Sequence, residues 1–152
     1  MAVSIGAVDP HSVLFACGMN AIRSPMAAAI LRHLAGHRIY VRSVGVRAGE
    51  RDHFAVAVMK EIGIDITAHT PKSIDDLDDT SFDLIITLSP EAHHQALELT
   101  RTLAVEVEYW PTLDPSVASG SRDMILQSYR ACREGLFERI KARFQISGAP
   151  HI

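Results

Sequence analysis

The chain has 152 residues, a length that fits one globular domain, residues 1–152, with a substantial core. Its 15 Lys and Arg against 18 Asp and Glu give a formal net charge of −3, which excludes a global basic field for nucleic acid or anionic lipid. No apolar run reaches the roughly 20 residues of a membrane span, and residues 1–11 lack a basic segment followed by an apolar one, so we expect a cytoplasmic protein without a membrane partner.

Short apolar runs alternate along the chain with segments of helical periodicity, which is the pattern of parallel βαβ units. The predicted strands lie near residues 12–16, 39–45, 82–88 and 104–109. The predicted helices occupy residues 25–35, 53–62, 90–99 and 121–145, and a short helix opens at Ser73. We therefore expect a three-layer α/β fold in which helices flank a four-stranded parallel sheet. In such sheets, functional residues collect beyond the carboxyl ends of the strands.

The first predicted strand runs into a cysteine, a short turn and an Arg-Ser pair. Cys17 stands six positions before Arg23, so its thiol can lie at the base of a loop whose backbone N–H groups point inward. Ser24 and Pro25 read as the N-cap and first residue of a helix, whose partial positive charge favours a bound dianion and the thiolate form of the cysteine. Arg23 can hold two phosphate oxygens at once. This stretch predicts a phosphate-transfer site after the first strand.

The loop and the start of its helix consist of Cys17, Gly18, Met19, Asn20, Ala21, Ile22, Arg23, Ser24, Pro25, Met26 and Ala27. This segment resembles the signature loop of the low molecular weight protein tyrosine phosphatases, a family whose fold also includes thioredoxin-coupled arsenate reductases. The resemblance continues in order through residues 43–45, 58–66, 69, 82–87 and 114–115, and it covers roughly residues 12–145.

The resemblance implies a role for each residue of the loop, with no cofactor and no metal. Cys17 would be the nucleophile, and Ser24 would donate a hydrogen bond to its thiolate. The asparagine that matches Asn20 is held in the family by a serine and a histidine, which correspond to Ser43 and His69 here. An asparagine in this position also tolerates the left-handed backbone conformation. The phosphate would be bound by the backbone N–H groups of Gly18, Met19, Asn20, Ala21, Ile22 and Arg23.

Asp114 is the candidate general acid. Asp-Pro is an ordinary turn signal, and Asp9-Pro10 shows the same dipeptide without a role that we can assign. Asp114, however, follows the fourth predicted strand, and the family places its proton donor there. Because this loop and the Cys17 loop both leave carboxyl ends of strands, we expect them to meet.

The chain departs from the family pattern in three places. Ile22 stands where many members have a second cysteine, so the neighbouring thiol that shelters the nucleophile from overoxidation is missing. Met19 stands where many members have glycine. Residues 116–120 replace the tyrosines with which eukaryotic-type members sandwich an aryl ring. Strict specificity for phosphotyrosine is therefore in question, and we expect aromatic contacts with the substrate to come from Phe54, Tyr109 or Trp110.

The remaining cysteine, the acidic residues and the histidines have structural interpretations. Cys132 is expected to be a buried core thiol, because it shares an apolar stripe of the last helix with Ile125, Tyr129, Leu136, Ile140 and Phe144. His93 and His94 have no partner at the spacing of metal ligands. A solvated helix start explains most of the acidic cluster Asp75, Asp76, Asp78, Asp79 and Asp83 better than a cation site does.

These observations favour a metal-independent phosphomonoesterase. It would act on aryl phosphates, either phosphotyrosine in a protein or a small ester, through a cysteinyl-phosphate intermediate. An arsenate reductase on the same loop is one alternative, but its chemistry passes the oxidised state to further cysteines after the third strand, where this chain has Ser89. A reductase that relies on small thiols needs no such relay and stays open. A phosphate- or phosphopeptide-binding module is a third possibility, against which the intact set of Cys17, Arg23 and Asp114 argues.

Overall fold

The computed structural model describes residues 10–78 and 81–144, and its centre is one parallel sheet. The sheet has four strands in the order β2-β1-β3-β4. Its strands are β1 (Ser12–Cys17), β2 (Tyr40–Gly45), β3 (Leu84–Thr87) and β4 (Glu106–Tyr109). Every strand pair is parallel, so all the carboxyl ends lie along one edge, as the alternating pattern predicts.

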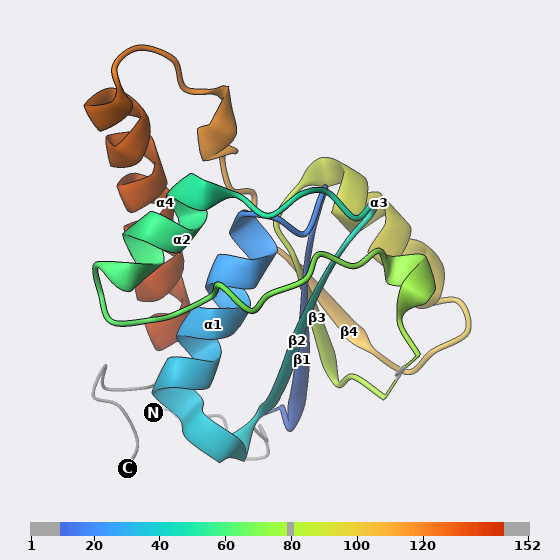
Figure 1. Ribbon diagram of the computed structural model, residues 1–152. Coiled ribbons are helices and arrows are strands. Elements are labelled where there is room, and N and C mark those ends of the chain that lie inside the picture. Colours follow the sequence, from blue (N-terminus) through green and yellow to red (C-terminus); the bar gives the residue numbers. More distant parts are fainter. Residues whose placement is uncertain (1–9, 79–80, 145–152) are drawn as a thin grey trace.

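Helices cover both faces of the sheet (Figure 1). One layer contains α1 (Arg23–Ala35), α2 (His53–Lys60) and α4 (Arg122–Phe144), and the other contains α3 (Pro90–Leu99). Three short 3₁₀ helices complete the described residues: η1 (Gly36–Arg38), η2 (Ile74–Asp76) and η3 (Pro115–Val117). The three-layer prediction is confirmed, as is the short helix after Ser73; position 145, the last of the predicted helix, lies outside the described residues. No helix in 10–78 or 81–144 is long and apolar enough to cross a membrane.

The central strand β1 is buried on both faces. Val13, Phe15 and Cys17 belong to the core cluster shared with α1 and α4, while Leu14 and Ala16 belong to the cluster under α3. A strand that is covered on both sides has no solvent face, which explains its unbroken apolar sequence. This alternation also directs the side chain of Cys17 toward the α1 and α4 layer.

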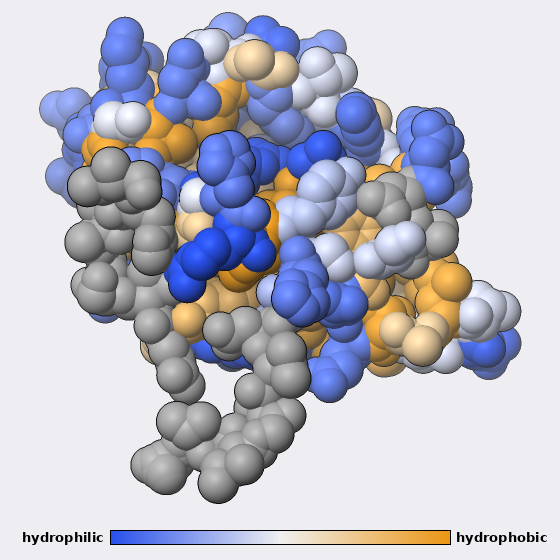
Figure 2. All heavy atoms as spheres, turned by 90° about the horizontal axis from the view of Figure 1, so that it is seen from below, coloured by the Kyte–Doolittle hydropathy of each residue, from blue (hydrophilic) through white to orange (hydrophobic). Residues whose placement is uncertain are grey.

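The face of the molecule below the sheet mixes hydrophilic and apolar side chains (Figure 2). Seen from below, strongly hydrophilic side chains gather in the middle of the face, between patches of apolar ones (Figure 2). The strands run upward in Figure 1, so their carboxyl ends and the loops that follow them lie at the other end of the molecule. The candidate site is therefore sought in those loops.

Candidate functional site

The Cys17 loop, residues 17–23, joins β1 to α1 at the carboxyl edge of the sheet. A neighbouring segment fixes its outer side: Val46 N–H donates to the Cys17 carbonyl (3.0 Å), Arg47 N–H to that of Gly18 (2.9 Å) and Gly49 N–H to that of Met19 (2.8 Å). Within the described part of the chain, the N–H groups of residues 18–22 have no acceptor. A short loop with its carbonyls bound on one side and its N–H groups unpaired is suited to binding an anion.

Gly45 allows this close approach of two backbones. A Cβ atom at this position would lie 2.5 Å from the Arg47 carbonyl oxygen, 2.6 Å from the Asn20 nitrogen and 2.7 Å from the Met19 carbonyl carbon. These separations are far shorter than carbon atoms tolerate. The glycine at the end of β2 is therefore a requirement of the loop that it supports.

Asn20 shapes the middle of the loop. Its φ of 55° lies in the left-handed region, as predicted, and its side chain is buried. The side-chain carbonyl accepts from Lys72 N–H (2.8 Å), the side-chain amide donates to Ser24 Oγ (2.9 Å), and the backbone carbonyl accepts from His69 Nε2 (2.8 Å). Since a carbonyl only accepts, His69 carries its proton on Nε2 in this contact.

Of the two residues expected to hold Asn20, His69 contacts it and Ser43 does not. Ser43 pairs with Phe15 inside the sheet, and the described residues offer its side chain no hydrogen bond. The serine that reaches the Asn20 amide is Ser24, from the first turn of α1. Burial lowers the pKa of His69, and nearby positive charges, among them Arg32, lower it further, although its bond to Asn20 opposes this shift.

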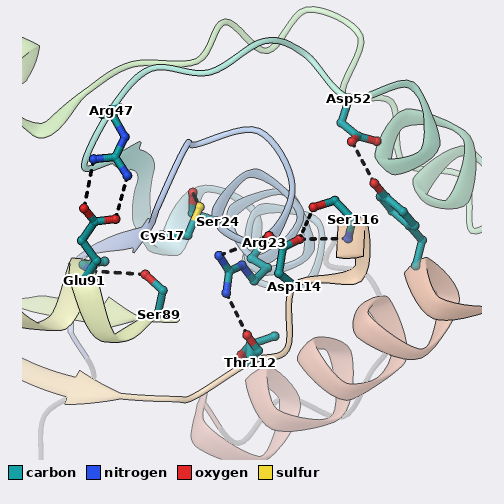
Figure 3. Close-up of polar contacts among 12 residues, drawn as sticks. Cys17, Arg23, Ser24, Arg47, Asp52, Ser89, Glu91, Thr112, Asp114 and Ser116 are labelled. Carbon is teal, nitrogen blue, oxygen red and sulfur yellow. Dashed lines mark hydrogen bonds and ion pairs between the residues drawn. The ribbon is translucent and has the colours of Figure 1, made fainter. Parts of the chain in front are cut away.

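Ser24 does not cap the helix, but its hydroxyl lies beside the Cys17 sulfur, as the resemblance implies. Helix α1 begins at Arg23 with Ile22 at the N-cap, and Ile22 supplies no capping side chain, so the prediction of Ser24 as N-cap is wrong. The hydroxyl of Ser24 instead lies 3.0 Å from the sulfur of Cys17 and also donates to the Val44 carbonyl (3.2 Å) (Figure 3). A buried hydroxyl beside a thiol can donate its proton to the thiolate when that form is present.

Arg23 connects the Cys17 loop to the segment that follows β4. Its Nη1 donates to the Thr112 carbonyl (2.9 Å), and its Nη2 lies 4.0 Å from Oδ2 of Asp114 (Figure 3). The other carboxylate oxygen of Asp114, Oδ1, accepts from the N–H (2.9 Å) and the hydroxyl (2.7 Å) of Ser116. These bonds hold the carboxyl group in place and leave Oδ2 for another proton-bearing partner.

These side chains meet in a cleft of about 170 Å³. Its lining consists of Cys17, Met19, Ala21, Ile22, Arg23, Glu50, Asp52, Asp114 and Ser116. The cleft thus unites the predicted nucleophile, arginine and general acid from the two halves of the chain. None of the three aromatic residues expected to contact the substrate lines this cleft: Phe54 packs on Tyr129, Tyr109 stacks on His93 and the buried Trp110 meets the edge of Phe15.

Sequence reasoning missed Glu50 and Asp52 as parts of the cleft. Asp52 caps α2 through Ala55 N–H (3.0 Å) and accepts from the Tyr129 hydroxyl (2.8 Å), so it also connects α2 to α4. Burial and this hydrogen bond raise the pKa of Tyr129. An aspartate just before an apolar periodic segment is a helix-start signal, which could have identified the cap but not its place in the cleft.

The opposite side of the site has a different pair of charged residues. Arg47 and Glu91 form a two-pronged ion pair, with both N–O distances at 2.9 Å (Figure 3). Glu91 lies in the first turn of α3, and Ser89 caps that helix by accepting from Ala92 N–H (3.3 Å), so this serine has a structural role. Arg47 therefore joins the Cys17 loop to α3, because its backbone N–H donates to the Gly18 carbonyl and its side chain pairs with Glu91.

Cys132 is only half-buried, so the prediction of a core thiol is wrong in part. It packs against the core but also lines a cavity of about 530 Å³ between α4 and the segment after β4. Burial raises the pKa of its thiol to about 11, while the charge of Arg23 acts in the opposite direction. Cys132 therefore favours its neutral form at neutral pH.

The acidic and histidine residues show no metal-binding arrangement. Within residues 10–78 and 81–144, no three His, Cys, Asp or Glu side chains lie close enough to hold a metal ion. Asp76 accepts from the Ser73 hydroxyl, and Asp83 accepts from the backbone N–H groups of His11 and Ser12 at the start of β1. Asp79 lies outside the described residues.

Comparison with known proteins gives two kinds of relative. Residues 12–145 match the family described as "Low molecular weight phosphotyrosine protein phosphatase". An arsenate reductase of Bacillus licheniformis is 33% identical over 141 residues, which are 93% of this chain and 99% of the relative. Among solved structures, a low molecular weight protein tyrosine phosphatase from T. tengcongensis is 27% identical (TM-score 0.74, covering 88% and 97% of the two chains). An arsenate reductase in its phosphate-binding state is 28% identical (TM-score 0.68, covering 88% and 96%).

Proposed function

Because the chain belongs to the low molecular weight phosphotyrosine protein phosphatase family, we propose that it hydrolyses aryl phosphate monoesters, above all phosphotyrosine in proteins, through a cysteinyl-phosphate intermediate. The observation that supports this activity best is the single cleft that contains Cys17, Arg23 and Asp114. A nucleophile, a bidentate cation and a proton donor in one small cleft supply every group that such a displacement needs.

In the first step the Cys17 thiolate attacks phosphorus in line with the leaving oxygen. The unpaired N–H groups of residues 18–22 and the Arg23 guanidinium hold the other phosphoryl oxygens as negative charge shifts among them. Asp114, protonated on Oδ2, gives its proton to the leaving phenolate as the P–O bond breaks and the P–S bond forms. Ser24 stabilises the thiolate before attack, since its hydroxyl lies 3.0 Å from the sulfur.

In the second step water attacks the phosphorus of the cysteinyl phosphate. The Asp114 carboxylate takes a proton from this water as the P–S bond breaks, which restores the acid and releases inorganic phosphate with the Cys17 thiolate. Ser116 binds Oδ1 throughout, so the same oxygen, Oδ2, donates the proton in one step and accepts it in the other.

Arsenate reduction is the second candidate, because the B. licheniformis relative carries that name. The residues of this chain favour it less. The sequence has two cysteines, Ser89 stands where a relay thiol would be expected, and burial raises the pKa of Cys132 to about 11. A thiol that stays neutral at pH 7 is a slow attacking group, because the thiolate is the nucleophile. A reductase built on this chain would depend on external thiols.

One comparison separates the two activities. We expect the purified protein to hydrolyse para-nitrophenyl phosphate and phosphotyrosine and to show no thioredoxin-coupled reduction of arsenate. The Cys132→Ser variant should keep nearly all of the hydrolysis. Robust arsenate reduction that disappears in Cys132→Ser would overturn the choice of phosphatase, and reduction with glutathione and glutaredoxin alone would support the reductase without an internal relay.

A further inference from the structure

A second cavity lies beside the catalytic cleft and is not used by the proposed mechanism. It measures about 530 Å³ and lies between α4 and the segment 110–118 after β4. Its walls are mainly apolar and include Trp110, Leu113, Val117 and Leu136. A volume of this size is typical of sites that enclose a ligand or a large side chain.

The cavity adjoins the catalytic cleft. Asp114 lines both of them, so the general acid forms the partition between the two spaces. Cys132, in the wall of the cavity, lies near enough to the catalytic groups that the charges of Arg23, Asp114 and Cys17 all influence the pKa of its thiol. A molecule that places its phosphate against Cys17 therefore has the mouth of the cavity next to its leaving group.

The border of the cavity exposes large apolar side chains. Leu113 is 91% exposed and Val117 is 80% exposed, and they flank Asp114 on the same segment. Exposed apolar groups clustered around a polar centre are typical of surfaces that bind a partner. The catalytic cleft alone, with about 170 Å³, would leave these groups uncovered by a substrate of the size of phosphotyrosine.

We propose that this cavity is a subsite for an apolar side chain of a polypeptide substrate, next to the phosphorylated residue in its sequence. The inference rests on the proposed phosphatase function and specifies its substrate class. An extended chain advances about 3.3–3.6 Å per residue, so a residue one to three positions from the phosphotyrosine reaches a space that begins at Asp114. Burial of one leucine or phenylalanine side chain there should raise kcat/KM by about tenfold or more.

Gly135 of α4 allows a test that leaves the catalytic groups unchanged. It lines the cavity, and a Cβ atom at this position would meet nothing within 4 Å. A Gly135→Leu side chain can therefore fill part of the space without a clash in the helix. Gly135→Ala is the matched control, since it removes the helical glycine but adds only one methyl group.

The experiment measures kcat/KM for para-nitrophenyl phosphate and for two phosphotyrosyl peptides, one with leucine and one with serine beside the phosphotyrosine on both sides. We expect the wild type and Gly135→Ala to favour the leucine peptide by about tenfold. Gly135→Leu should lose most of that preference while its rate on para-nitrophenyl phosphate stays within about twofold. Equal rates on the two peptides in the wild type, or a preference that Gly135→Leu keeps, would overturn the subsite.

A second measurement reports on occupancy without turnover. In Cys17→Ser the only thiol left is Cys132, so the rate of its modification by a maleimide reports access to the cavity. The leucine peptide should slow this modification by about fivefold at near-saturating concentration, because few sites then stay open, and the serine peptide should protect less. Equal protection by both peptides would contradict the subsite. A wild type that hydrolyses neither peptide nor para-nitrophenyl phosphate would instead overturn the proposed function.

Discussion

Arg23 and Asp114 face each other across the mouth of the catalytic cleft, with Nη2 and Oδ2 4.0 Å apart (Figure 3). The arginine is 14% exposed and the aspartate 38%, so the carboxylate is the more accessible of the two. In the proposed mechanism the guanidinium would bind the phosphoryl oxygens, and Oδ2 would face the leaving group. The proposed mechanism thus gives phosphate binding to Arg23 and proton transfer to Asp114.

Asp114→Asn should lower kcat for phenyl phosphate by about 10²–10⁴-fold, the usual contribution of a general acid. An amide cannot supply the proton, although it can still accept from Ser116 at Oδ1 and keep the local structure. The loss in kcat should be much smaller for para-nitrophenyl phosphate, because its leaving group needs little protonation. Steady-state kinetics on the two esters gives the comparison, and an equal loss on both would mean that Asp114 positions groups rather than donates a proton.

Cys17→Ser should abolish turnover but keep the binding of inorganic phosphate, since Arg23 and the N–H groups of residues 18–22 are unchanged. A serine hydroxyl ionises far above neutral pH and is a poor nucleophile here. Calorimetry with phosphate and a sensitive assay on para-nitrophenyl phosphate test both halves of this prediction. Retention of more than about a hundredth of the wild-type rate would contradict the covalent mechanism, because loss of an essential nucleophile costs several powers of ten.

Gly45→Ala should damage the Cys17 loop from outside the cleft. The added Cβ would lie 2.5–2.7 Å from backbone atoms of Met19, Asn20 and Arg47, so the loop or β2 must shift. We expect a loss of about 1–3 kcal/mol in unfolding free energy and at least a tenfold loss in kcat/KM. Gly135→Ala, in open space on α4, is the control and should be neutral or more stable. Equal Tm and activity for both variants would contradict the packing role of Gly45.

The strands and helices follow from periodicity, and Cys17 and Arg23 follow from a short, well-defined loop. Asp114 follows only from the resemblance to the family, and the sequence does not predict Glu50 and Asp52 as parts of the cleft. The N-cap assigned to Ser24 is wrong, since a serine before Pro25 reads as a cap, whereas its place beside the Cys17 sulfur agrees with what the resemblance implies. Cys132 lies on an apolar stripe, but whether the segment after β4 closes over that stripe depends on tertiary packing. The partners of Phe54 depend on long-range contacts in the same way.

Glu61 should make stability depend on pH in acid. Hydrogen bonds from Arg130 and Arg133 lower its pKa from 4.5 to about 2. Its contribution to stability is therefore complete above about pH 4.5 and is lost as the pH falls toward 2. Glu61→Gln should lower Tm at pH 7, and the difference in Tm between this variant and the wild type should become smaller between pH 4.5 and pH 2.5. Glu98→Gln, which loses only an exposed pair with Arg101 at 3.5 Å, is the control and should show no such narrowing. A gap that stays constant across this range would contradict the assignment.

We expect the position of β4 at the edge of the sheet to determine when a refolding chain becomes active. β4 pairs only with β3 in the described sheet, whereas the Cys17 loop rests on β1, β2 and α1. Closing the longer stretch of chain that brings Asp114 to Arg23 costs more entropy, so we expect it to follow formation of the loop. In stopped-flow refolding, phosphate binding should recover before hydrolysis of phenyl phosphate, the ester that needs the proton of Asp114; simultaneous recovery would contradict this order. A half-folded molecule would then sequester phosphate esters without destroying them, and catalysis would begin only with the last strand to dock.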